Sequence, residues 1–408
     1  MLDTAGQGMF YHGRVADFGF VFDCGSSSRS SSFENAISRF KSGLGNHSLD
    51  LLVISHLHAD HVSGLDELLR GIRVRYAVVP YLDPLERLFV ALRNRRREDW
   101  YHRFLADPVS FLFERDVEKI VVIGSGNDKQ RHDDRGSLPP ETGEEGFARQ
   151  TKIDDDSFDM PNDETTEEDI SHNESDWRRF LGQGRLLVKN HRGCVKISNV
   201  WLFRFFNYRV EKSKLTNFGS CVRKEFGIQD HDVTAATLGD ILIDGKRRRK
   251  LAQCYKMVDR DLNNTSLIAF HGPLFRIRIR PSSRYGLRGL VFPPGAWNIP
   301  EGYVGYFLTG DTDLNHPMWT DCESHFHNYF GRISGVLLPH HGAKKNWNRK
   351  LVDSIISRGS YPNWYVSAGI GNRYGHPSAE VIQDVLGFGH GLAWSNEFLE
   401  VLEEYPLR

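Results

Sequence analysis

Short, almost wholly apolar runs recur along the chain, and most of them end directly in polar residues. Such runs are typical of strands that are buried on both faces. The runs that predict strands are residues 18–23, 51–54, 78–80, 120–123, 200–206, 266–270, 303–309, 335–338 and 364–367. Residues 33–43, 62–69, 85–105 and 378–386 instead repeat apolar positions every three or four residues, which favours helices. Strands interleaved with helices predict an α/β fold.

This pattern breaks between residues 126 and 176. Residues 151–176 hold eleven acidic residues and one lysine, and such a segment buries too little apolar surface to offset the entropy of ordering it. We therefore expect residues 1–125 and 177–408 to be the two parts of one domain, interrupted by a disordered acidic insertion at 126–176. The insertion is either a passive solvated loop or a lid that mimics DNA and shields a basic cleft.

Composition excludes several classes of protein. The 408 residues carry 52 basic and 53 acidic side chains, a net charge of −1, so the chain is not a basic nucleic-acid coat, although a local basic patch stays open. The chain contains no run of 18 apolar residues, so no membrane span is predicted. The first residues lack a signal-peptide pattern. Five scattered cysteines without C-x-x-C spacing favour a reducing cytosol, with neither a disulfide framework nor a thiolate zinc site. These cysteines are Cys24, Cys194, Cys221, Cys254 and Cys322.

Four ligand-type side chains lie within the six residues 56–61, just after the apolar run 51–54. They are His56, His58, Asp60 and His61. Imidazole and carboxylate together suit zinc, manganese or iron. In an extended segment His56, His58 and Asp60 share one side, and His61 turns away as a helix begins. One loop can thus offer two ligands to one metal ion and two to a neighbouring ion.

Other strand ends repeat this pattern. Asp311 follows the strand at 303–309, the pair His340-His341 follows the strand at 335–338, and His376 follows the strand at 364–367. An aspartate at such a position could bridge two metal ions, one oxygen to each. Polar residues gathered at strand ends are how α/β folds build active sites along one edge.

These residues resemble the metallo-β-lactamase superfamily, whose signature HxHxDH is present as His56-Leu57-His58-Ala59-Asp60-His61. Asp23 looks like the first motif of that superfamily, Asp311 matches its bridging aspartate, and His376 matches its last histidine ligand. The resemblance runs from about residue 5 to residue 391, around the insertion. It implies a four-layer αββα sandwich with the metal ions on one edge.

Four further motifs resemble one branch of the superfamily, which includes the nuclease-like domain of the bacterial competence DNA-uptake channel. They are Asn263-Asn264-Thr265-Ser266-Leu267, Leu308-Thr309-Gly310-Asp311, Pro339-His340-His341-Gly342 and Asn372-Arg373-Tyr374-Gly375-His376-Pro377. Many relatives carry another metal-binding histidine before the bridging aspartate, but no matching site is found here. We expect an asparagine in its place, since His271 falls at the far end of that strand and is expected to be structural. Fewer imidazoles would make manganese a candidate beside zinc.

The resemblance implies two divalent metal ions, zinc or manganese, that act on a phosphodiester. His56 and His58 would hold one ion, Asp60, His61 and His376 the other, and Asp311 would bridge them. Asp60 also counts among the catalytic residues. His340 or His341 would be the general acid or stabilise charge on the phosphate, as a separate histidine does in related tRNA-processing nucleases, and the choice between them stays open.

Nucleic acid, with DNA favoured, is the expected substrate. The expected substrate-binding residues are Asn263, Asn264, Asn372, Arg276 and Arg278. Basic runs that could contact a phosphate backbone lie at residues 93–97, 246–250 and 276–280. The enzyme could serve as an effector in a bacterial defence system, controlled by a partner protein, and it could form a homo-oligomer. The alternatives are a hydrolase of a lactone, thioester or cyclic nucleotide, and a non-enzymatic scaffold that retains the fold.

Overall fold

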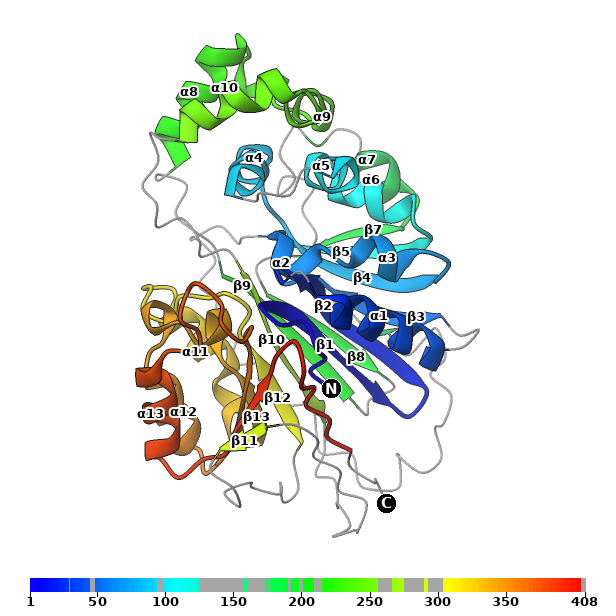
Figure 1. Ribbon diagram of the computed structural model, residues 1–408. Coiled ribbons are helices and arrows are strands. Elements are labelled where there is room, and N and C mark those ends of the chain that lie inside the picture. The colour runs from blue at the N-terminus through cyan, green and yellow to red at the C-terminus, as the bar shows by residue number, and fades with distance from the viewer. Residues whose placement is uncertain are drawn as a thin grey trace.

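Two β-sheets face each other at the centre of the molecule, with helices on their outer sides (Figure 1). The computed structural model describes residues 1–28, 30–44, 48–93, 98–124, 158–159, 174, 177–189, 192–197, 201–208, 215–255, 266–274, 290–292 and 304–404. An antiparallel β-bridge pairs Leu2, near the start of the chain, with Val401, near its end.

The first sheet is built from the N-terminal half of the chain. In spatial order its strands are β1 (Gly8–Val15), β2 (Phe18–Ser26), β3 (Leu49–Val53), β4 (Val74–Pro80), β5 (Val117–Ile123) and β7 (Leu186–Lys189). The strands β2, β3, β4, β5 and β7 run parallel to one another, and β1 pairs antiparallel with β2 at the edge. Alternate side chains enter two different cores: Leu51 and Val53 face the second sheet, whereas Leu52 and Ile54 pack under the outer helices. Burial on both faces explains the continuous apolar runs.

The second sheet is mixed. In spatial order its described strands are β11 (Leu290–Phe292), β15 (Leu392–Ser395), β14 (Asn363–Ser367), β13 (Ile333–Leu337), β12 (Gly305–Leu308), β10 (Ser266–Pro273), β9 (Trp201–Tyr208), β8 (Arg192–Ile197) and β6 (Phe158–Asp159). β12 to β15 are parallel, and β10 runs antiparallel to β12. The carboxyl ends of β12, β13 and β14 and the start of β10 therefore meet at one edge, where the candidate ligands lie.

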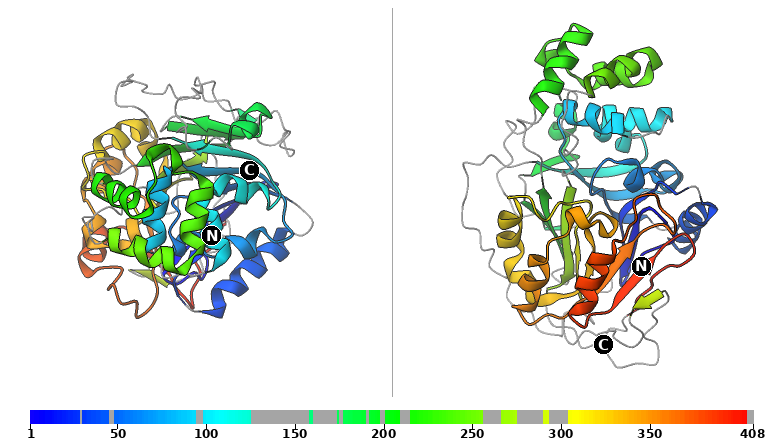
Figure 2. Two further views of the ribbon diagram at one scale, coloured as in Figure 1. Left: turned by 90° about the horizontal axis from the view of Figure 1, so that it is seen from above. Right: turned by 60° about the vertical axis from the view of Figure 1, so that its left-hand side comes forward.

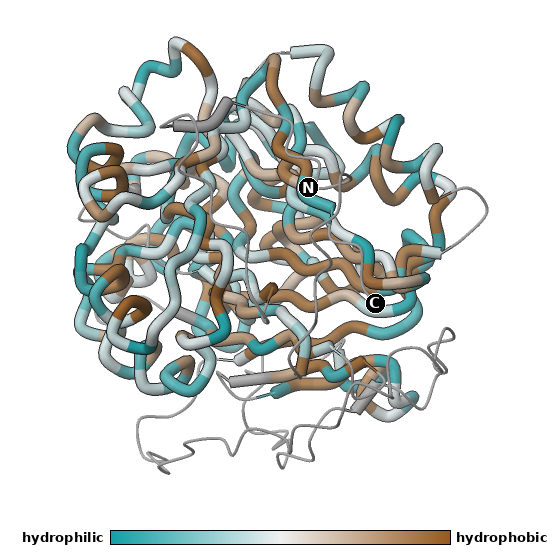
Figure 3. The backbone as a smooth tube through the Cα atoms, turned by 90° about the horizontal axis from the view of Figure 1, so that it is seen from below, coloured by the Kyte–Doolittle hydropathy of each residue, from teal (hydrophilic) through white to brown (hydrophobic). Residues whose placement is uncertain are grey.

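Helices cover both outer faces, so the layers are helix, sheet, sheet, helix. Those on the first sheet include α1 (Ser31–Leu44), α3 (Leu65–Leu69), α5 (Asp99–Ala106), α6 (Pro108–Phe113) and α7 (Arg178–Gly182). Those on the second sheet are α11 (Trp319–Phe326), α12 (Lys350–Ile356) and α13 (Ala379–Gly387). Apolar residues concentrate along the central strands, as the brown segments of the tube show (Figure 3). The predicted αββα sandwich is confirmed.

Two predicted helices are divided in the structure. In place of one helix over 62–69, α2 (Ala59–Val62) ends at Val62 and α3 begins at Leu65, directly after Gly64. The predicted helix 85–105 is present as α4 (Pro84–Arg93) and α5, which begins at Asp99. Periodicity finds the apolar face of such segments but not the residues that end a helix.

A group of helices stands apart from the sheets, at the top of Figure 1 and of the right-hand view in Figure 2. It consists of α8 (Thr216–Phe226), α9 (Ala235–Ile243) and α10 (Gly245–Tyr255). A disulfide between Cys221 and Cys254 joins α8 to α10. The scattered cysteines predicted no disulfide framework, and the structure contains this one disulfide. The two cysteines are 33 residues apart, and only the packing of α8 against α10 brings them together.

This disulfide gives a prediction about thiol reactivity. In denaturant without reductant, three thiols should react with Ellman's reagent, those of Cys24, Cys194 and Cys322, and all five should react after reduction. Closing a loop of this length stabilises the oxidised protein by about 3–4 kcal/mol in the chain-entropy model, so reduction should lower the melting temperature. Five reactive thiols before reduction would contradict the pairing.

The acidic insertion was expected to be disordered between residues 126 and 176, and most of it lies outside the described residues. Three of its residues are described. Phe158 and Asp159 form β6, which pairs antiparallel with β8. Glu174 is buried and forms an ion pair with Arg87 of α4. At these points the insertion is attached to the domain, because strand pairing and a buried ion pair offset the cost of ordering.

No helix in the described part of the chain is long and apolar enough to cross a membrane.

Candidate metal centre

The His/Asp loop leaves β3 and enters α2 within a few residues. Ala59 already begins α2, so Asp60 and His61 are helical and the two-residue alternation stops at His58. The ring of His61 consequently lies 3.8 Å from the ring of His56 instead of turning away, and the ring of His58 lies 4.9 Å from that of His56. The loop still divides into two pairs: His56 with His58, and Asp60 with His61.

Asp23 and Ser55 orient two of these imidazoles. Ser55 donates both its N–H and its hydroxyl to the carboxylate of Asp23, at 2.6 and 2.5 Å. Because that hydroxyl proton is committed, Nδ1–H of His56 donates to Ser55 Oγ at 2.9 Å. His61 donates Nδ1–H to Asp23 Oδ2 at 2.7 Å. Asp23 is fully buried behind the imidazoles and therefore positions them, leaving Nε2 of each free to bind a metal ion.

Asp311 lies between the two pairs. Its Oδ1 is 3.2 Å from His61 Nε2, and its Oδ2 is 3.4 Å from His56 Nε2. The residue before it is Gly310, with φ of +54°, where a Cβ would lie 2.2 Å from Ser266 Oγ. Only glycine allows this close approach. The backbone N–H of Asp311 donates to the same Ser266 hydroxyl at 3.3 Å. The start of β10 thus helps to place the carboxylate with one oxygen toward each pair.

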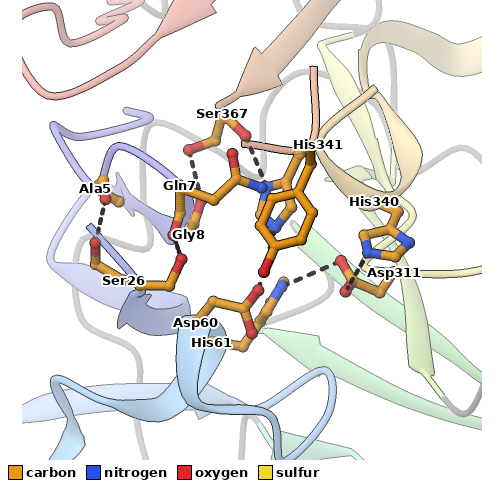
Figure 4. Close-up of polar contacts among 12 residues, drawn as sticks. Ala5, Gln7, Gly8, Ser26, Asp60, His61, Asp311, His340, His341 and Ser367 are labelled. Atoms are coloured by element: carbon orange, nitrogen blue, oxygen red, sulfur yellow. Dashed lines mark hydrogen bonds and ion pairs between the residues drawn. The ribbon is translucent and has the colours of Figure 1, made fainter. Parts of the chain in front are cut away.

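The turn after β13 brings two more histidines to the centre (Figure 4). His340, His341 and Gly342 all have positive φ, a backbone that costs about 1–2 kcal/mol for each residue that is not glycine. His341 donates Nδ1–H to the carbonyl of Ser367 at 2.7 Å, and its Nε2 lies 3.5 Å from Asp60 Oδ2. His341 therefore joins Asp60, His61 and Asp311 in one cluster.

The donor atoms fit metal ions in their chemistry and spacing. Four of them are buried without a hydrogen-bond partner among the described residues: Nε2 of His56, His61 and His341, and Oδ1 of Asp311. Ligands placed tetrahedrally at about 2.0–2.1 Å from zinc lie about 3.3–3.4 Å from each other. The separations of 3.2 to 3.5 Å between neighbouring donors match that value. The residues present fit two ions, one near His56 and His58, the other near Asp60, His61 and His341, with Asp311 shared.

Charges in the centre are strongly coupled. Burial by itself raises the pKa of Asp311, but the positive charges of His340, His61 and His56 hold it well below its usual range. Burial lowers the pKa of His61, but the carboxylates of Asp311 and Asp23 hold it well above its usual value. Burial also raises the pKa of Asp60, which the neighbouring His341 and His61 keep low. Buried carboxylates here require positive charge, which divalent cations supply.

His376 and Asn372 take other places than the sequence suggested. His376 belongs to none of the clusters found among the described residues. Its ring lies 5.9 Å from that of His340, and its Nδ1 is buried with no hydrogen-bond partner in the described part of the chain. Burial, with the positive charges of His340 and His341, lowers the pKa of His376 to about 4. His341 therefore occupies the place that was expected for His376.

Asn372 was expected to bind substrate, but its amide is engaged within its own loop. Its Nδ2 donates to the carbonyls of Gly369 and His376, at 2.7 and 2.5 Å. Its Oδ1 accepts from the backbone N–H groups of Tyr374 and His376, at 3.1 Å each. Asn372 thus shapes the loop that carries His376 and has no spare hydrogen-bonding capacity for a substrate.

The other predicted substrate residues, Asn263, Asn264, Arg276 and Arg278, lie outside the described residues. His271 is described and is not a ligand. It lies five residues along β10 from Ser266, and Tyr11 Oη is 2.9 Å from its Nε2. Burial lowers the pKa of His271 to about 3, so it remains neutral between the sheets.

Sequence reasoning missed three residues that build the centre: Ser55, Ser266 and Asn346. Ser55 directly precedes the HxHxDH motif, and Ser266 lies in the Asn-Asn-x-Ser-Leu motif. A recognised sequence motif therefore marks the position of each serine. Asn346 lies in no motif. Its contact with His340, 3.0 Å between Oδ1 and Nδ1, depends on how the turn after β13 folds back.

Comparison with known proteins agrees with this geometry. A family model described as the metallo-beta-lactamase superfamily matches residues 14–151. The match includes Asp23 and the HxHxDH loop and ends before Asp311 and His341. No curated protein matches the chain. Residues 14–151 are thus similar to the metallo-beta-lactamase superfamily, and the two-sheet sandwich and the His/Asp clusters are consistent with a metal-dependent hydrolase.

Proposed function

We propose that the protein is a metal-dependent phosphodiesterase that cleaves nucleic acid, with DNA the favoured substrate. The observation that carries the proposal is the pair of donor clusters that share Asp311, with four buried donor atoms that have no hydrogen-bond partner among the residues the structure describes. Two metal ions about 3.5–4 Å apart supply a hydroxide near neutral pH and a clamp for the oxygens of an in-line phosphoryl displacement. Preference for nucleic acid rests on the motifs shared with the competence-channel branch.

The residues of the centre have separate roles in the proposed reaction. Asp23 and Ser55 keep Nδ1 of His61 and His56 occupied, so that Nε2 of each faces the centre. Asp311 supplies one oxygen to each cluster. His340, which lies in neither cluster and whose Nε2 is 3.5 Å from Asp311 Oδ2, is the imidazole available to give a proton to the leaving oxygen.

Tyr374 offers a surface for a nucleobase. Tyr374 is 54% exposed, and its ring lies nearly parallel to that of His376, at 5.9 Å and 16°, with the Arg373 guanidinium 4.8 Å from the ring centre. Stacking of a base on an aromatic side chain contributes about 1–3 kcal/mol. Tyr374→Ala should therefore raise KM for a single-stranded oligonucleotide about tenfold or more, while Tyr374→Phe should not. Steady-state kinetics with bis(p-nitrophenyl) phosphate, which has no base, should be nearly unchanged in both variants. An equal loss on both substrates would contradict the stacking role.

Support for a polyanionic substrate also comes from α10. Lys246, Arg247, Arg249 and Lys250 are exposed on this helix, although Arg247 and Lys250 are within 4.0 and 3.2 Å of acidic side chains. A local concentration of basic side chains in a chain of net charge −1 is the electrostatic feature that binds a phosphate backbone.

A cleavage assay tests the proposal. Protein loaded with manganese, zinc or magnesium is incubated with single- and double-stranded DNA and RNA, and in parallel with a cyclic nucleotide, a lactone and a thioester. The control is the double variant Asp60→Ala, His61→Ala. We expect cleavage of a polynucleotide by the wild type and none by the control. Turnover of only the small molecules would overturn the proposal and favour the alternative hydrolase.

A further inference from the structure

We propose that a cavity between the two sheets, separate from the metal centre, binds a small neutral aromatic molecule that carries a carbonyl oxygen. The cavity has a volume of about 540 Å³. Its wall comes from α1, from β1 and β2 of the first sheet, and from β9, β10, β12, β13 and β14 of the second. None of its lining residues belongs to the donor clusters found among the described residues. The inference is therefore independent of the proposed function.

This cavity is a gap in the core of the domain. Protein interiors pack as densely as organic crystals and leave few voids larger than a water molecule. Here Phe20, Leu308 and Leu337 line the gap, although they belong to the apolar cluster that fills the space between the sheets. Arg14 and Ala16 also line it and are exposed, so a ligand can enter from that side. A volume of this size lies within the range of small-molecule sites, about 300–1,000 Å³.

Aromatic rings from both sheets form much of the wall. Tyr11 and Phe20 belong to the first sheet, and Trp201, Tyr306 and Tyr365 belong to the second. Aromatic rings attract one another in offset-stacked and edge-to-face arrangements. A flat aromatic ligand in the cavity can make such contacts with both sheets at once.

Two buried nitrogen atoms of the wall have no hydrogen-bond partner in the described part of the chain. They are Nε1 of Trp201, a residue 5% exposed, and Nδ1 of His271, a residue 1% exposed. The other ring nitrogen of His271 lies 2.9 Å from Tyr11 Oη. An indole N–H is only a donor, so Trp201 requires an acceptor such as a carbonyl oxygen. A buried donor without a partner costs free energy, which a ligand with that oxygen recovers.

Charges on the wall favour a neutral ligand. The carboxylate of Glu403 accepts hydrogen bonds from the hydroxyls of Tyr306 and Tyr365, each at 2.5 Å. Arg14 and Arg39 also line the cavity. An anion would be repelled by the carboxylate, and a cation by the two guanidinium groups. A ligand of either charge would also lose hydration in a space lined largely by apolar side chains.

Binding of a series of naphthalene probes tests the site. 2-Acetylnaphthalene has the carbonyl oxygen, naphthalene lacks it, and 2-naphthoate is an anion. Affinities for the whole chain are measured by isothermal titration calorimetry. Trp201→Phe removes the indole N–H and keeps an aromatic ring. Trp364→Phe is the matched control, because Trp364 is also buried with no partner for Nε1 among the described residues but is not part of the cavity wall.

We expect 2-acetylnaphthalene to bind the wild type and Trp364→Phe equally well. Trp201→Phe should weaken its binding about 3–10-fold, the effect of losing one hydrogen bond, and should leave naphthalene binding within about twofold of the wild type. 2-Naphthoate should bind the wild type about tenfold more weakly than 2-acetylnaphthalene, because its charge must be dehydrated. An equal loss of both neutral probes in Trp201→Phe would overturn the assignment of the acceptor, and tighter binding of the anion would overturn the neutral ligand.

A crystal of the wild type supplies a measurement that does not depend on the folding of a variant. Soaking with 2-acetyl-6-bromonaphthalene should give a bromine anomalous peak inside the cavity, with the carbonyl oxygen at hydrogen-bonding distance from Trp201 Nε1. If no probe binds the wild type, or if the bromine lies elsewhere, the cavity holds only water and the proposal is refuted.

Discussion

Replacing Asp311 with asparagine is expected to lower metal-dependent hydrolysis by about 10³-fold or more. An amide keeps the shape of the side chain but removes the charge that both clusters share, so neither ion retains its common ligand. Metal ions contribute several kcal/mol to such reactions, and each 1.36 kcal/mol corresponds to a factor of ten in rate. The measurement is kcat/KM for the wild type and variant on the same oligonucleotide, with bound metal counted in parallel.

The matched control for this experiment is Asp313→Asn, two residues away. Asp313 accepts hydrogen bonds from Asn315 in a surface turn and belongs to neither cluster. It should keep both activity and two bound ions. An Asp311→Asn protein that binds two ions and cleaves at more than a tenth of the wild-type rate would show that Asp311 does not bridge.

Asp23→Asn is expected to disable the centre without removing any donor that faces a metal ion. Asp23 Oδ2 accepts from both Ser55 Oγ and His61 Nδ1. An amide NH₂ at that position would force His61 into the opposite tautomer, with its proton on Nε2, because two donors cannot face each other. A wrong tautomer of a positioned histidine severely impairs function even where geometry is kept. We expect metal affinity to fall about 10–100-fold.

Asp23→Ala should add a loss of stability to this effect. It leaves the buried imidazole of His61 without its partner, which costs about 3 kcal/mol in the free energy of unfolding. The φ of Asp23 is +57°, a conformation that aspartate and asparagine tolerate better than alanine. Urea unfolding of the metal-free proteins should therefore rank wild type above Asp23→Asn and Asp23→Ala last. Equal stabilities with unchanged metal binding would contradict the positioning role.

Much of the centre follows from local sequence. The apolar run of β3 predicts a strand buried on both faces, and the HxHxDH residues directly after it must lie at the end of that strand. The same logic places Asp311 after β12 and the histidine pair after β13. Strand ends of parallel neighbours meet at one edge, so a short local pattern is enough to predict the gathering of these residues.

What the sequence did not reveal depends on backbone direction and on contacts between distant segments. Three successive left-handed residues turn His341 toward Asp60 and leave His376 beside His340. No residue pattern predicts three left-handed residues in a row, since only Gly342 favours this backbone conformation intrinsically. The pairing of Cys221 with Cys254 and the bond from Asn346 to His340 likewise arise from packing.

The most direct test of two neighbouring metal sites is anomalous diffraction from crystals grown with manganese. We expect two anomalous difference peaks about 3.5–4 Å apart, on either side of the Asp311 carboxylate. One should lie beside His56 and His58, and the other among Asp60, His61 and His341. Peaks elsewhere, or none at Asp311 in a fully metal-loaded protein, would contradict the account.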